Sequence, residues 1–140
     1  MPHPTAHPPV QAPRRSSRQP VWAPSEEALH RACLQWANLH LGRYPLLHWL
    51  IHVPNGGKRP KGEAGKLRAM GTKPGVPDLL LPFPSPSGAW KGLAIEFKSA
   101  TGKLTPQQKA WLDQMAAAGW KTAVIRSLDE FIDTMHEFLR

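Results

Sequence analysis

Three residues that can take part in chemistry stand in two short apolar runs near the middle of this sequence. Asp78 belongs to the run 75–81, and Glu96 and Lys98 close the run 92–98. Each run has the length of a β-strand and is bordered by proline, glycine or serine, which favour turns. The sequence therefore predicts a β-hairpin that carries two acids and a lysine.

The pairing of the two predicted strands decides whether these residues meet. If the strands run antiparallel with Leu80 opposite Ala94, Asp78 falls opposite Glu96, because one pair fixes the rest of a ladder. Side chains alternate between the faces of a strand, so Glu96 and Lys98 share a face. We therefore expect two carboxylates and an ammonium group at one end of an otherwise apolar hairpin.

Such a group of charges suits metal-assisted phosphate chemistry. Two carboxylates a few ångströms apart repel each other, and one of them normally takes up a proton. A divalent cation removes the repulsion, and Mg²⁺ prefers carboxylates, waters and phosphate oxygens as ligands. The lysine can then hold an attacking water or stabilise charge on a phosphate. The alternative is an ordinary surface ion pair, since such short patterns recur by chance.

Four separated motifs resemble a known nuclease family. They are PNGGKR (54–59), GVPD (75–78), IEFKS (95–99) and LTPQQ (104–108). The acids and lysine of the second and third motifs resemble the signature of the PD-(D/E)XK nuclease superfamily. All four motifs in this order resemble the VRR-NUC (virus-type replication-repair nuclease) family, and the resemblance covers about residues 25–140.

The resemblance implies a metal-dependent phosphodiesterase that acts on DNA. Glu26, Asp78, Glu96 and the main-chain carbonyl of Phe97 are expected to hold one or two Mg²⁺ or Mn²⁺ ions. Lys98 is expected to orient or activate the water. These roles make Asp78, Glu96 and Lys98 predicted catalytic residues, and the resemblance adds Gln108 as a fourth.

A helix predicted over residues 25–41 positions the remaining acid. Ser25 is a good N-cap, and Glu26 and Glu27 suit the positive start of a helix. At about 100° per residue, Glu26 falls on the apolar stripe that contains Cys33, whereas Glu27 points away. A lone buried charge is costly, so Glu26 is the predicted ligand, with Glu27 in reserve. Both acids serving only the helix start is the alternative.

A second long helix is predicted from Thr105 to Gly119. Thr105 is its N-cap, Pro106 suits the first turn, and Gln108 is the reciprocal residue of a capping box. In the family, a glutamine at this point is associated with the active site. Capping and catalysis therefore both explain Gln108, and the sequence leaves the choice open.

A basic loop lies between the first two motifs. The chain has a formal net charge of +8, and the excess in residues 25–140 is concentrated between residues 56 and 73. Such a patch attracts phosphate backbones. The predicted DNA-binding residues are Lys58, Arg59, Lys61, Lys66, Arg68 and Lys73. The alternative is a solvated loop that keeps the protein soluble.

The remaining elements complete an α/β fold. A strand is predicted over 46–53, a short helix over 62–70, a strand over 120–125 and a helix over 128–139. Apart from the short helix, the order is α-β-β-β-α-β-α, which predicts a mixed sheet flanked by helices. The resemblance implies the restriction-endonuclease-like core of the PD-(D/E)XK superfamily.

Composition sets the domain organisation. The proline- and arginine-rich residues 1–24 are predicted to be a disordered tail, and residues 25–140 to form one nuclease domain. The single Cys33 excludes an internal disulfide framework, and no apolar run is long enough for a membrane span. The single cysteine fits a reducing cytoplasm, and the resemblance implies a bacterial or phage-infected cell.

The leading hypothesis is a structure-selective DNA endonuclease. Small members of the family are homodimers that cut branched DNA such as four-way (Holliday) junctions, and a two-fold dimer presents two sites to a two-fold junction. The alternatives are a nuclease for flaps or single strands, or a non-catalytic nucleic-acid-binding module. No nucleotide cofactor is expected, because the chain has no phosphate-binding glycine loop.

Overall fold

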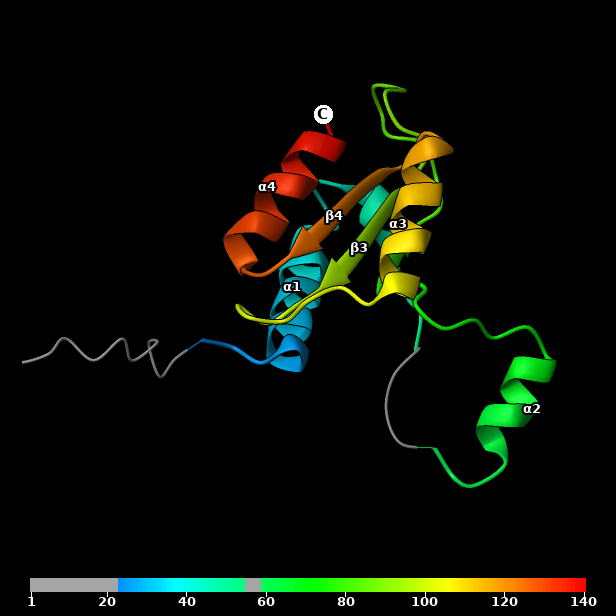
Figure 1. The fold of residues 1–140 in the computed structure, drawn as a ribbon. Helices are drawn as coiled ribbons and strands as arrows, with labels where there is room; N and C mark the ends of the chain where they lie inside the picture. The colour runs from blue at the N-terminus through cyan, green and yellow to red at the C-terminus, as the bar shows by residue number, and fades with distance from the viewer. Residues whose placement is uncertain (1–22, 55–58) are drawn as a thin grey trace, which may run out of the picture.

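A four-stranded mixed sheet organises the chain in the computed structural model, which describes residues 23–54 and 59–140 (Figure 1). In chain order the elements are α1 (Glu26–Leu39), the 3-10 helix η1 (Pro45–Trp49), β1 (Ile51–His52), α2 (Glu63–Ala69), β2 (Leu79–Leu81), β3 (Leu93–Phe97), α3 (Pro106–Ala117), β4 (Lys121–Ile125) and α4 (Leu128–Phe138).

The strands lie side by side in the order β1-β2-β3-β4. The first two pairs are antiparallel and the last is parallel, with α3 as the crossover between β3 and β4. Leu80 lies opposite Ala94, so the predicted register of the hairpin is confirmed. The predicted α/β class with a mixed sheet is confirmed as well.

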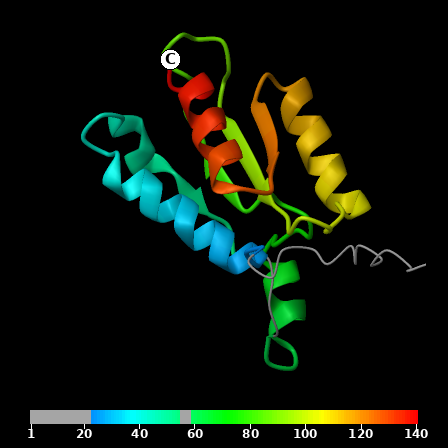
Figure 2. The same cartoon turned by 90° about the vertical axis from the view of Figure 1, so that its left-hand side faces the viewer.

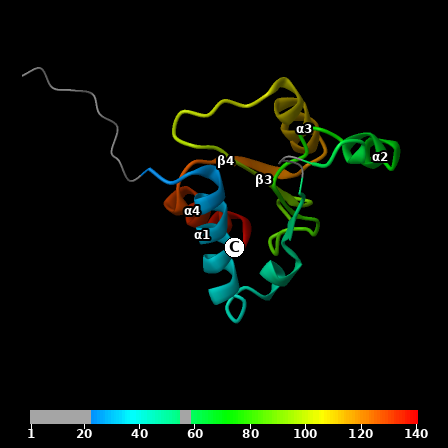
Figure 3. The same cartoon turned by 90° about the horizontal axis from the view of Figure 1, so that it is seen from below.

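Helices cover both faces of this sheet. Seen from below in Figure 3, α3 lies on one face, and α1 and α4 lie on the other. The turned view in Figure 2 shows α1 and α4 packed along the sheet. Cys33 of α1 and Phe131 of α4 are fully buried between the helices and Phe97 of β3. This core fixes the start of α1 and the end of β3 relative to each other.

The prediction of a strand over residues 46–53 is largely wrong. Residues Pro45–Trp49 form a 3-10 helix, and only Ile51 and His52 pair as a strand. Pro45 stands in the first turn, where its fixed φ angle favours a helical start and its missing N–H costs nothing. Leu47 is buried but Trp49 and Ile51 are about half exposed, so the predicted alternation fails.

Residues 59–74 form an arm that lies between β1 and β2 in the chain. It contains α2, which buries none of its residues and stands apart from the sheet in Figure 1. The short helix predicted over residues 62–70 is therefore present. Lys58 and residues 1–22 lie outside the described residues, as do the predictions made for them. No helix of the described part has the length and apolar character of a membrane span.

Candidate active site

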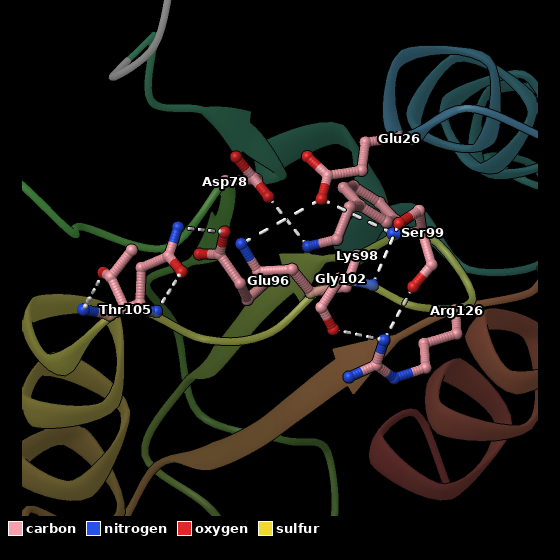
Figure 4. A network of polar contacts seen from close by, with 10 residues as sticks. Glu26, Asp78, Glu96, Lys98, Ser99, Gly102, Thr105 and Arg126 are labelled. Atoms are coloured by element: carbon pink, nitrogen blue, oxygen red, sulfur yellow. Dashed lines mark hydrogen bonds and ion pairs between the residues drawn. The ribbon is translucent and has the colours of Figure 1, made fainter.

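Asp78 and Glu96 meet at the end of the hairpin, where β3 stops. Asp78 directly precedes β2, and its Oδ2 atom accepts a hydrogen bond of 2.7 Å from the main-chain N–H of Phe97 (Figure 4). Its side chain therefore reaches across to the strand that carries Glu96 and Lys98. The antiparallel register brings the two acids to the same edge of the sheet.

Glu96 is a buried acid that lacks a full set of partners. Its Oε1 atom accepts a hydrogen bond of 3.0 Å from Nε2 of Gln108, but its buried Oε2 atom has no hydrogen-bond partner among the described residues. Burial, followed by the charge of Asp78, raises the pKa of Glu96 to about 8. The unpartnered oxygen of Glu96 and the neighbouring carboxylate of Asp78 together are suitable donors for a divalent cation.

Lys98 brings a nearly buried ammonium group to this pair of acids. Its side chain is 9 % exposed, and its Nζ atom lies 4.0 Å from Oε1 of Glu26. Its main-chain N–H donates to the carbonyl of Ile125, so β4 holds the end of β3 in place. An ammonium group removed from water needs negative charge nearby, and the acids of the site supply it.

The first turn of α1 directs Glu26, and not Glu27, toward the site. Oε1 of Glu26 accepts a hydrogen bond of 3.4 Å from the N–H of Ser99 in addition to its contact with Lys98. Glu27 forms an exposed ion pair of 2.9 Å with Arg31 on the outer side of the helix. The two acids therefore lie on different sides of α1, as the helical phase predicts. The expectation that Glu26 is a buried charge is wrong, because its side chain is 49 % exposed.

The three predicted acids do not form a closed cage. Within residues 23–54 and 59–140, no three acidic, histidine or cysteine side chains come together closely enough to hold a metal ion on their own. Asp78 and Glu96 form the compact pair, whereas Glu26 contacts Lys98. Its role as a third metal ligand, like that of the Phe97 carbonyl, stays a prediction.

Gln108 takes part in both arrangements that the sequence left open. Its side-chain oxygen accepts the N–H of Thr105 at 2.9 Å, and its own N–H donates to Oγ1 of Thr105 at 3.2 Å, which completes the capping box. Its side-chain nitrogen holds Glu96. One amide therefore couples the start of α3 to the buried acid.

Two histidines support the strand ends beside the acids. The ring of His30 stacks on Phe97 at a centroid distance of 4.8 Å and meets the ring of His52 edge to face at 4.6 Å. Nδ1 of His52 hydrogen-bonds to the carbonyl oxygen of Asp78 at 2.8 Å. Burial, followed by the charge of His52, lowers the pKa of His30. His52 is thus a residue of the site's frame, which the sequence analysis did not identify.

Arg126 is a second residue that the sequence analysis did not identify. Its Nη1 atom donates to the carbonyl oxygens of Ser99 at 2.6 Å and Gly102 at 2.8 Å. This guanidinium holds the turn that joins Lys98 to α3 (Figure 4). Arg126 directly follows β4, and no feature of the sequence indicated that its side chain would reach back to this turn.

The predicted DNA-binding residues within the described part are exposed on the arm. They are Arg59, Lys61, Lys66, Arg68 and Lys73. None of them pairs with a carboxylate among the described residues. Their charges are therefore available to phosphates, which is the electrostatic condition for a backbone contact.

Comparisons with known proteins agree with the motifs. The family model of the VRR-NUC domain matches residues 25–129. A solved structure described as a VRR_NUC domain protein superposes with a TM-score of 0.67 and 27 % sequence identity, over 82 % of this chain and 88 % of that chain. Among curated proteins, no sequence gives a significant match.

Proposed function

The chain belongs to the VRR-NUC family of nucleases, and we propose that it is an endonuclease that hydrolyses DNA phosphodiester bonds with a divalent cation. One observation carries the proposal within this family. Glu96 is buried beside Asp78 with an unpartnered oxygen, and its pKa is raised to about 8. Without a cation, one of the two acids must hold a proton, and a cation that joins both carboxylates removes this cost.

The donor atoms suit Mg²⁺ or Mn²⁺. Asp78 and Glu96 offer carboxylate oxygens, and the carbonyl of Phe97 and the carboxylate of Glu26 are the further ligands that we propose. A cation held there would polarise the scissile phosphate and offset the negative charge that develops on it.

The protein side chains have separate tasks in this proposal. Lys98, almost buried and facing Glu26, holds the attacking water or the non-bridging oxygen of the phosphate by donating hydrogen bonds. Gln108 keeps the carboxylate of Glu96 in one orientation. The N–H of Phe97 does the same for Asp78.

Branched DNA is the proposed substrate, and a homodimer the proposed assembly. The support is the resemblance to small VRR-NUC members, together with a basic arm whose charges lie free of acids among the described residues. A dimer would bring two equivalent sites to the two strands of a junction. The rival candidate is a module that binds nucleic acid without cutting it.

A cleavage assay separates these functions. Labelled four-way junction, flap, splayed, duplex and single-stranded DNA are incubated with the protein in Mg²⁺, Mn²⁺ or EDTA. We expect cleavage only with a divalent cation, and loss by at least about a hundredfold in Asp78→Asn and Lys98→Ala. Binding of every substrate without cleavage in either metal would favour the non-catalytic module.

Metal binding gives an independent readout for the helical acid. Added Mg²⁺ should raise the melting temperature of the wild type, because a ligand stabilises the state that it binds. The rise in melting temperature should shrink in Glu26→Gln and persist in Glu27→Gln. Glu27→Gln is the matched control, because it makes the same chemical change on the other side of α1. Equal responses of the two variants would remove Glu26 from the ligand set.

A further inference from the structure

A two-part hollow lies where the arm meets the body of the protein. Its parts have volumes of about 200 Å³ and about 350 Å³. Arg59, Leu67, Thr72 and Lys73 line both parts. We call this hollow the arm pocket. It is distinct from the buried acids described above, because none of them lines it.

The lining of the arm pocket combines positive charge with apolar surface. Arg59 and Lys73 line both parts and Arg68 lines the smaller one, and no carboxylate pairs with them among the described residues. Leu67 lies in both parts, and Trp111 of α3 lines the larger one. A ligand that fits this lining has an anionic group and a flat apolar face, as a nucleotide does.

The arm pocket is joined to the active site through two short stretches of chain. Val76, which lines the larger part, stands two residues before Asp78. Trp111 stands one helical turn after Gln108, and its Nε1 atom donates to the carbonyl of Pro74 at 3.1 Å. A DNA strand lying across Asp78 would therefore pass close to the arm pocket, because Val76 lines its larger part.

We propose that the arm pocket receives an unpaired nucleotide of the DNA strand, with its base against Trp111 and Leu67 and its phosphate against Arg59 and Lys73. A base inside a duplex has both faces covered by its neighbours, so only an unstacked base can contact the indole ring. A DNA branch point or flap supplies such a base. This inference rests on the proposed nuclease function and names the feature of the substrate that it recognises.

A binding experiment without cleavage tests the pocket. The full chain carrying Asp78→Asn is titrated in EDTA against fluorescent blunt duplex DNA and against the same duplex with a short single-stranded extension. We expect the extension to be preferred by about fivefold or more, the range for stacking one base on an aromatic ring. Because no metal and no catalysis are involved, this result is independent of whether the protein cuts DNA.

Two substitutions of the same residue separate base stacking from structure. Trp111→Phe and Trp111→Leu both lose the hydrogen bond to Pro74, but only Trp111→Leu loses the aromatic face. The preference for the extension should persist in Trp111→Phe and fall to near one in Trp111→Leu, while affinity for blunt duplex stays similar. Trp49→Leu, at an exposed tryptophan beside Phe83, is the control and should keep the preference.

Several outcomes would overturn the proposal. They are equal affinity for the two DNAs, equal behaviour of the two Trp111 variants, or tighter binding of an RNA extension than of the DNA extension. Sedimentation of the same variants covers a second copy of the chain as the occupant. A dimer that becomes monomeric in Trp111→Leu alone would assign the pocket to that copy. Melting temperatures of both Trp111 variants close to that of the parent protein establish that each is folded.

Discussion

At the scale of single residues, Glu96 shows how the site departs from what a stable fold requires. The residue is 3 % exposed, and its carboxyl group accepts one hydrogen bond from Gln108 and leaves one oxygen without a partner among the described residues. Its pKa is raised by burial first and by Asp78 next. The folded state therefore holds a proton that the unfolded chain releases, and stability must depend on pH.

Glu96→Gln should remove this pH dependence in metal-free protein. With a folded pKa of about 8 against 4.5 for the free group, wild type loses stability as pH rises between these values. Glutamine imitates the protonated acid, so the variant should match wild type near pH 5. It should exceed wild type by on the order of 1–3 kcal/mol above pH 8. Urea denaturation in EDTA measures the difference, and parallel pH curves would contradict the raised pKa.

Gln108→Glu should separate the two contacts of Gln108. Glutamate serves a capping box as well as glutamine does, so α3 should stay stable. Its carboxylate would face Glu96 where the amide now donates at 3.0 Å, and the added repulsion should lower cleavage by roughly tenfold or more. Gln107→Glu, one residue earlier and exposed, is the control. If both variants cleave like wild type, Gln108 is only a cap.

The sequence predicted which acids and lysine the fold brings together better than it predicted the residues that support them. Asp78, Glu96 and Lys98 carry the motif themselves, and strand alternation predicts that Glu96 and Lys98 share a face. Helical phase predicts that Glu26 points toward them. Arg126 could not be predicted, because its partner Ser99 lies 27 residues earlier and the contact exists only after β3 and β4 pair. Packing across the sheet, and not local sequence, determines such supports.

At the scale of elements, the local sequence failed to predict the segment before β1, where a 3-10 helix and a very short strand follow each other. Apolar residues 46–53 suit a strand, but Pro45 starts a 3-10 turn and leaves β1 only two residues. The hairpin and α3 were predictable because turn residues and a capping box mark their limits. β1, which is shorter than predicted, lies at the edge of the sheet, so the error does not affect the register of β2 with β3.

Gly75 lies just before β2 and packs against the first turn of α3. Its φ angle is 83°, and a Cβ atom there would lie 2.6 Å from the main-chain carbon of Gln107. Gly75→Ala should therefore push the approach to Asp78 away from α3. We expect a loss of more than about 2 kcal/mol of unfolding free energy, together with a large loss of cleavage.

Gly88→Ala is the matched control for this substitution. Gly88 has a similar φ angle of 77°, but a Cβ atom there meets nothing within 4 Å. The control should lose about 1 kcal/mol from backbone strain alone and keep its cleavage activity. Equal losses of stability and activity in the two variants would mean that the contact between Gly75 and α3 does not position the site.

At the scale of the whole molecule, the functional groups gather at one end. Glu26 begins α1, Lys98 follows β3 and Gln108 lies in the first turn of α3, so three elements direct side chains to the same edge of the sheet. The arm leads into β2 at this edge through Gly75 and Asp78. Other basic residues, such as Lys91 just before β3, stand at the opposite ends of these elements.

This polarity predicts an uneven salt dependence of DNA binding. Replacing Arg59, Arg68 and Lys73 together with alanine should weaken binding to all DNA structures, because we propose that these charges contact phosphates. Each lost phosphate contact should lower the slope of log affinity against log salt by about 0.9. Titrations of the Asp78→Asn protein at several salt concentrations measure the slope without cleavage.

A control with the same change in net charge distinguishes contact from general attraction. Arg43, Lys91 and Arg140 follow or precede the opposite ends of α1, β3 and α4, and are exposed. Replacing these three with alanine removes the same formal charge but no residue near the site. The slope should then stay close to that of the parent protein, because charges beyond about 10 Å are largely screened at moderate salt. Equal slopes for the two triple variants would mean that DNA senses only the overall charge, and that the arm makes no specific contact with its backbone.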